Sequence, residues 1–120
     1  MTGFIIVALG GAFGSMLRYA ISLIPYRGTF PVLTLIINVC GAVLIGYIAG
    51  TAAEKHLSDN LVLFLKTGIC GGFTTFSTFS LEAYNLIGQG RYGQAGVYVV
   101  LSTGLCLLGV WCGMLLARVS

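Results

Sequence analysis

Four long apolar stretches follow one another along this chain, and short polar segments separate them. Crossing about 30 Å of hydrocarbon takes roughly 20 apolar residues in a helix. We therefore predict one all-α domain over residues 1–120, with transmembrane helices at about 3–24, 32–53, 61–87 and 94–117. Pro25, the polar residues 54–60 and the segment 88–93 separate these helices. Asp59 or Asn60 is expected to cap the third helix by accepting its free N–H groups.

The composition indicates that lipid is the solvent for most side chains. Hydrophobic residues make up 58% of the 120 positions and charged residues 8%, whereas a soluble domain carries about 25% charged residues. The net charge of +3 is scattered, and without a basic run we expect no nucleic-acid partner. The four cysteines show no paired spacing and there is a single histidine, so neither a zinc site nor an enzyme is expected.

The basic residues are shared evenly between the two sides of the membrane. With four crossings, one side receives Lys55, Lys66 and Arg118, and the other receives Arg18, Arg27 and Arg91. An excess of Lys and Arg on one side fixes the orientation of a membrane protein. The balance here predicts insertion in both orientations (dual topology). Two oppositely oriented copies would form an antiparallel homodimer, which is the arrangement that inverted repeats give within one transporter chain.

Pairs of glycines recur at a spacing of four residues. The pairs are Gly10/Gly14, Gly46/Gly50, Gly68/Gly72 and Gly109/Gly113. Small residues at this spacing allow the backbones of membrane helices to approach closely. Each pair has two interpretations, which are packing within one copy and contact between two copies.

The centre of the third predicted helix, residues 68–82, is unsuited to a regular helix. It contains three glycines, five hydroxyl residues and three phenylalanines. Glycine weakens a helix and hydroxyl groups compete for its backbone, so Gly71-Gly72 followed by Thr74-Thr75 predicts a break. A broken backbone at membrane depth is tolerated where it is buried or lines a hydrated cavity. Its free carbonyls favour cations and its free N–H groups favour anions.

Several side chains within the predicted helices have more than one interpretation. Phe76 and Phe79 share a helix face, with Glu82 one turn further along. Such a pair either packs or presents the positive edges of its rings to an anion. Asn38 forms an interhelical hydrogen bond or faces a pore as a donor. Arg18 extends its charge to the interface or acts as a cation at membrane depth.

Four stretches of the chain carry a resemblance to a known family. They are residues 10–19 (GGAFGSMLRY), 34–41 (TLIINVCG), 71–82 (GGFTTFSTFSLE) and 90–93 (GRYG). These stretches are similar to the Fluc/CrcB family of fluoride channels. The chain departs from the family at Leu33, where a glycine is usual. In the fourth predicted helix the match is loose, because many relatives carry Asn or Ser at the positions of Tyr98, Ser102 and Cys106.

The resemblance implies a dual-topology homodimer in the bacterial inner membrane, with two fluoride pathways that give toxic fluoride a passive exit and so confer fluoride resistance. The pathway residues that it implies are Phe76, Phe79, Asn38, Thr75, Ser77, Thr78, Tyr98, Ser102, Glu82 and Arg18. It also implies that the backbone carbonyls of Gly71 and Thr74 from both copies hold a structural Na⁺ at the dimer interface. Carbonyl oxygens at a break in the helix fit that role.

Two other transmembrane functions are possible for a chain of this length. A small dual-topology multidrug exporter needs a titrating carboxylate within the membrane, usually in its first helix. This chain has no acid in its first, second or fourth predicted helix, and only Glu82 near the end of the third. An accessory subunit would use the polar centre of the third helix to dock on a partner, and the purified protein alone would then show no flux.

Overall fold

The computed structural model describes all 120 residues, and every regular element is a helix. The elements are α1 (Thr2–Ser22), α2 (Val32–Lys55), α3 (Asp59–Val62), the π-helical segment η1 (Leu63–Cys70), α4 (Gly71–Phe73), α5 (Phe76–Gly88) and α6 (Tyr92–Val119). Four stretches are long and apolar enough to cross a membrane, namely Thr2–Ser22, Val32–Lys55, Asp59–Gly88 and Tyr92–Val119. The expected all-helical architecture with four crossings is confirmed, and the observed helix ends lie within two residues of the predicted ones.

The cap of the third crossing differs from the expected one. Ser58, and neither Asp59 nor Asn60, precedes the helix in an extended conformation, and its Oγ accepts a hydrogen bond from the N–H of Leu61 at 3.2 Å. Asp59 is instead the first residue of α3. A serine hydroxyl caps as well as a carboxylate does, and the Asp59 carboxylate in the first turn faces the positive end of the helix dipole.

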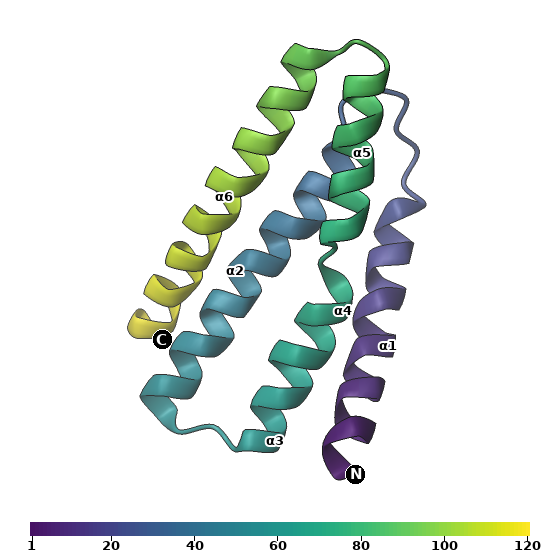
Figure 1. The fold of residues 1–120 in the computed structure, drawn as a ribbon. Helices are drawn as coiled ribbons and strands as arrows, with labels where there is room; N and C mark the ends of the chain where they lie inside the picture. The colour runs from purple at the N-terminus through teal and green to yellow at the C-terminus, as the bar shows by residue number, and fades with distance from the viewer.

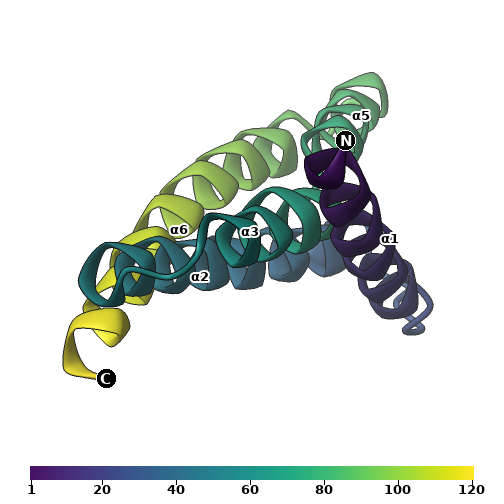
Figure 2. The same cartoon turned by 90° about the horizontal axis from the view of Figure 1, so that it is seen from below.

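The four crossings are arranged as two packed pairs. α2 lies along α6, whereas α1 lies along η1 and α4 (Figure 1). Viewed from below, α1 and α6 diverge, and the α2–α3 connection joins one pair to the other (Figure 2). Both termini and the α2–α3 loop lie at one end of the bundle, while the other two loops lie at the opposite end (Figure 1). The third crossing therefore faces α1 on one side and the α2–α6 pair on the other.

The glycine pairs pack helices within this one chain. A Cβ at Gly10 would stand 2.6 Å from the carbonyl oxygen of Phe64, and one at Gly14 would overlap the carbonyl oxygen of Ile69. Between α2 and α6, a Cβ at Gly46 would overlap the carbonyl oxygen of Val110. Contact inside one copy, the first of the two interpretations, is therefore what the structure shows for these glycines.

We expect Gly14→Ala to destabilise the fold by about 1–3 kcal/mol, the usual cost of overpacking a well-packed site. The added methyl group meets backbone atoms of Ile69 and Phe73, so α1 and η1 must separate. Gly88→Ala is the matched control, because nothing lies within 4 Å of a Cβ there. Thermal unfolding in detergent, followed by circular dichroism, measures both. Equal unfolding temperatures for the two variants would contradict the close approach of α1 and η1.

Candidate functional site

The third crossing is interrupted at Thr74 and Thr75, near the middle of the bundle. Both residues are extended, with φ −82° and ψ 158° at Thr74 and φ −148° and ψ 119° at Thr75. The break was expected in this segment, but its predicted cause was partly wrong, because Gly71 and Gly72 are helical. The two threonines separate α4 from α5, and their hydroxyls take over backbone hydrogen bonding, as short polar side chains do.

Hydrogen bonds of the two threonine hydroxyls fix both ends of the break. Thr74 Oγ1 donates to the carbonyl oxygen of Cys70 at 2.9 Å. Thr75 Oγ1 accepts from the N–H of Thr78 at 3.1 Å and so caps the start of α5. In a continuous helix that N–H would donate to the carbonyl of Thr74. The Thr74 carbonyl has therefore lost its helical donor.

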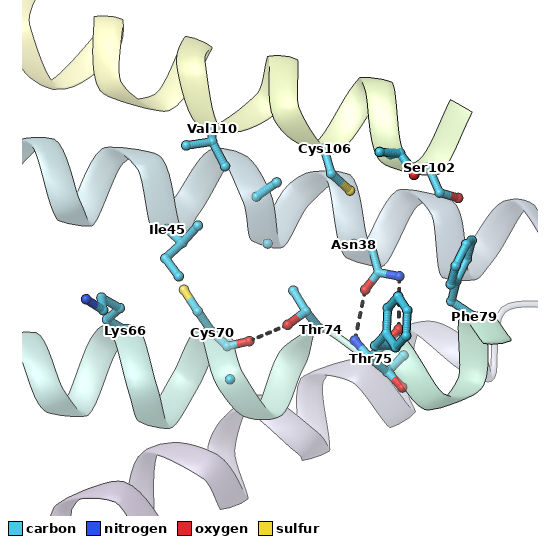
Figure 3. A pocket seen from close by; sticks show the side chains of 15 residues that line it. Asn38, Ile45, Lys66, Cys70, Thr74, Thr75, Phe79, Ser102, Cys106 and Val110 are labelled. Carbon is cyan, nitrogen blue, oxygen red and sulfur yellow. Dashed lines mark hydrogen bonds between the residues drawn. The ribbon is translucent and has the colours of Figure 1, made fainter. Parts of the chain in front are cut away.

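Asn38 of α2 binds the backbone of the break through both ends of its amide (Figure 3). Its Nδ2 donates to the carbonyl oxygen of Thr75 at 3.1 Å, and its Oδ1 accepts from the N–H of the same residue at 2.9 Å. Of the two interpretations of Asn38, the interhelical hydrogen bond is observed. The Thr75 N–H would reach the carbonyl of Gly71 in a regular helix, so the Gly71 carbonyl has lost its helical donor as well.

A cavity of about 390 Å³ lies between the break and the α2–α6 pair (Figure 3). It is lined by Asn38, Gly41, Ala42, Ile45, Lys66, Cys70, Gly71, Thr74, Thr75, Phe76, Phe79, Ser102, Thr103, Cys106 and Val110. Seven of the twelve expected site residues are thus brought together here. Ser102 is buried and its Oγ has no hydrogen-bond partner in the chain. That hydroxyl is therefore an unpartnered polar group at the wall of the cavity.

The two expected phenylalanines form a row with a buried tyrosine. The ring centroids of Phe76 and Phe79 are 5.5 Å apart, and those of Phe79 and Tyr98 are 5.0 Å apart. Phe76 is 78% exposed in the single chain, whereas Tyr98 is fully buried. Phe76 therefore projects from the bundle at the cavity, and Phe79 connects it to the interior.

Glu82 and Tyr98 lie behind Phe79, outside the first cavity. The Tyr98 hydroxyl donates to Glu82 Oε1 at 2.9 Å, and Thr34 Oγ1 donates to Oε2 at 3.0 Å. Glu82 and Thr34 line a second cavity of about 370 Å³ beside the α1–α2 loop. Phe30 also lines this second cavity and packs edge-on against Tyr98 at 5.6 Å. The rings of Phe79, Tyr98 and Phe30 therefore stand between the two cavities.

The remaining expected pathway residues, Arg18, Ser77 and Thr78, line neither cavity. Arg18 Nε donates to the carbonyl oxygen of Gly72 at 3.1 Å, on the α1 side of the third crossing. Ser15 Oγ lies 3.5 Å from the same oxygen. Ser77 is exposed, and its Oγ lies 3.4 Å from Thr75 Oγ1. Thr78 takes part through its backbone N–H. Arg18 therefore stabilises the backbone just before the break.

Sequence reasoning did not assign Lys66, Cys70, Thr103 or Cys106 to the site, although all four line the first cavity. Cys106 was within reach of pattern analysis, because it follows Ser102 by four residues and so shares its helix face. Cys70 and Lys66 were within reach in the same way, because Cys70 precedes the expected site residue Thr74 by four residues and Lys66 precedes Cys70 by four.

Comparison with known proteins places this arrangement in a family. Residues 5–114 match the family described as CrcB-like protein, Camphor Resistance (CrcB). The chain is 44% identical to the fluoride-specific ion channel FluC of Roseobacter denitrificans, over 98% of this chain and 97% of that protein. It is 47% identical to the protein of the same name from Ruegeria sp., over 93% and 91% of the two chains. The corresponding protein of Opitutus terrae is 45% identical, over 98% and 93%.

Proposed function

The chain belongs to the CrcB-like protein family, and on that premise we propose that it is a fluoride channel through which fluoride leaves the bacterial cell passively. One observation carries the proposal: relatives that are 44–47% identical over nearly the whole chain are named fluoride-specific ion channels. The protein is a multi-pass membrane protein, and the bacterial inner membrane is its proposed location. Conduction of an ion requires no covalent chemistry, so we propose no enzymatic step.

The 390 Å³ cavity offers donors that suit a small dehydrated anion. Asn38 uses one N–H of its amide on Thr75, which leaves its second N–H for another acceptor. The Ser102 hydroxyl has no partner in the chain. Phe76 and Phe79 add ring edges, which are the positive part of the aromatic quadrupole. These groups replace water without a fixed charge in contact with the ion, and throughput requires binding that is weak enough for release.

The multidrug exporter is less well supported than the channel. Its central requirement is a carboxylate within the membrane that is free to titrate. Both oxygens of Glu82 accept hydrogen bonds, from Tyr98 and Thr34. The relatives of this chain are also named as channels, which favours conduction over the accessory-subunit alternative.

The proposed function is tested by growth of a bacterial strain that lacks its own fluoride exporter. Expression of this chain should allow the strain to grow at fluoride concentrations that stop the same strain carrying an empty vector. The chloride tolerance of the two strains should be the same. Failure to restore growth, although the protein is present in the membrane, would contradict fluoride export.

We propose that two oppositely oriented copies form the conducting unit. The six basic residues are divided equally between the two sides, and the exposed Phe76 lies at a cavity on the side of the single chain. A tag after Ser120 should therefore react with an impermeant label from both sides of the membrane. Labelling of intact vesicles from one side only would exclude dual topology.

We also propose that Gly71 and Thr74 hold a Na⁺ ion between the two copies. Their carbonyls have lost their helical donors, because the N–H groups of Thr75 and Thr78 donate to side chains instead. Both residues line the cavity, and no cluster of acidic, histidine or cysteine side chains competes as a cation site. Two copies would contribute four such oxygens, and the ion would offset the negative ends of these dipoles.

Removing Na⁺ should weaken the proposed dimer. Exchange of Na⁺ for a bulky organic cation is expected to shift the detergent-solubilised protein from dimer to monomer and to reduce fluoride efflux, because the carbonyls of the two copies would then repel each other. Size-exclusion chromatography with light scattering measures the first effect. A dimer that is equally stable and active in both cations would argue against the site.

A further inference from the structure

Lys66 is the one charged residue that lines the 390 Å³ cavity. It belongs to the π-helical segment η1, and its side chain is exposed. Figure 3 shows Lys66 at the far end of the cavity from Phe79, beyond Cys70. The cation therefore stands at one mouth of the cavity and away from the proposed binding residues Asn38 and Ser102.

The same lysine also faces the aqueous end of the bundle. Lys66 also lines a third cavity, a groove of about 510 Å³ beside the α2–α3 loop, together with the titratable side chains of His56 and Asp59. Lys66 is the only residue that lines both this groove and the cavity. No carboxylate lies within the 4.0 Å ion-pair distance of its ammonium group. Lys66 therefore has no direct ion-pair partner where the loop groove meets the cavity, and Asp59 is the one acidic side chain that shares the groove with it.

Between this mouth and the polar end, the cavity wall is apolar. Ile45, Cys70 and Val110 lie between Lys66 and Thr74 (Figure 3). An anion in this part of the cavity meets few hydrogen-bond donors. A positive charge at the mouth raises the local concentration of anions there, because low-dielectric walls focus its field.

We propose that Lys66 concentrates fluoride at one mouth of the pathway; this role rests on the proposed channel function and deepens it. The lysine is exposed and keeps its hydration, so it attracts the anion without holding it in a fixed site. In the proposed antiparallel pair, each side of the membrane would have one such mouth.

The test compares fluoride efflux of the reconstituted wild-type protein with that of Lys66→Gln, Lys66→Met and Lys66→Arg, at low and high ionic strength set with an impermeant salt. We expect about a three- to tenfold lower rate for the two neutral variants at low salt. The difference should nearly vanish at high salt, since the Debye length falls from about 30 Å at 0.01 M to about 3 Å at 1 M. Lys66→Arg should retain the wild-type rate.

Lys55→Gln is the matched control. Lys55 is exposed, lies at the same end of the bundle and lines none of these cavities, so its loss should leave efflux unchanged. Wild-type rates in both neutral variants would overturn the role of Lys66. A loss that is independent of salt, or that appears equally in Lys66→Arg, would assign the residue to structure instead. Absence of fluoride efflux from the wild-type protein would refute the proposed function itself, and this role with it.

Discussion

Replacement of Phe76 or Phe79 by isoleucine is expected to abolish fluoride efflux while the helices stay folded. Both rings line the cavity beside Asn38 and Thr75, and isoleucine keeps the bulk of the side chain but removes the positive ring edge. We expect a loss of about a hundredfold or more, which corresponds to roughly 2.8 kcal/mol. Efflux from liposomes reconstituted with each variant measures the effect.

The structural cost of these substitutions differs between the two positions. Phe76 is 78% exposed, so its replacement should leave the unfolding temperature nearly unchanged. Phe79 packs on Tyr98, and its replacement should cost about 1 kcal/mol. Phe4→Ile is the matched control, because Phe4 is 80% exposed near the N-terminus and lines no cavity described above. Wild-type efflux in both cavity variants would rule out conduction along the phenylalanines.

Replacement of Asn38 by leucine should destabilise the protein and stop conduction together. Leucine preserves the volume but leaves the N–H and carbonyl of Thr75 without the partners that Asn38 supplies. Each unsatisfied buried backbone group costs about 1–3 kcal/mol. We therefore expect a loss of about 2–6 kcal/mol in the free energy of unfolding.

The loss of unfolding free energy in Asn38→Leu is measured by thermal unfolding in detergent. Fluoride efflux is assayed on the fraction of the variant that remains folded. Asn60→Leu is the control, because Asn60 is exposed in the first turn of α3. An unfolding temperature for Asn38→Leu equal to that of the control would show that the break does not depend on Asn38.

The four crossings were predictable because lipid offers no hydrogen-bond partners to the backbone. An apolar stretch that is long enough to cross the membrane must therefore form its backbone hydrogen bonds internally, as a helix. The exact residues of the break were harder to predict. Glycine costs a helix about 1 kcal/mol, yet Gly71 and Gly72 remain helical. Gly72 lies against the backbone of Gly11 in α1, so tertiary packing overrides its weak helix propensity.

Within the site, the residues on regular helices were the predictable ones. Phe76, Phe79 and Asn38 lie around one cavity, as their spacing and the family resemblance together indicated. Lys66 was not predicted, although it precedes Cys70, and Cys70 precedes Thr74, by four residues along the third crossing. Arg18 was among the expected pathway residues, and the close approach of α1 to α4 places its guanidinium on the carbonyl of Gly72. That contact depends on tertiary packing and cannot be inferred from spacing along α1.

The most direct test of the central claim is anion efflux from liposomes that contain the purified protein, with fluoride and chloride compared under a K⁺/valinomycin shunt. The cavity with its ring edges and unpartnered donors predicts rapid loss of fluoride while chloride is retained. No fluoride loss from a well-folded protein, or equal loss of both anions, would contradict a fluoride channel.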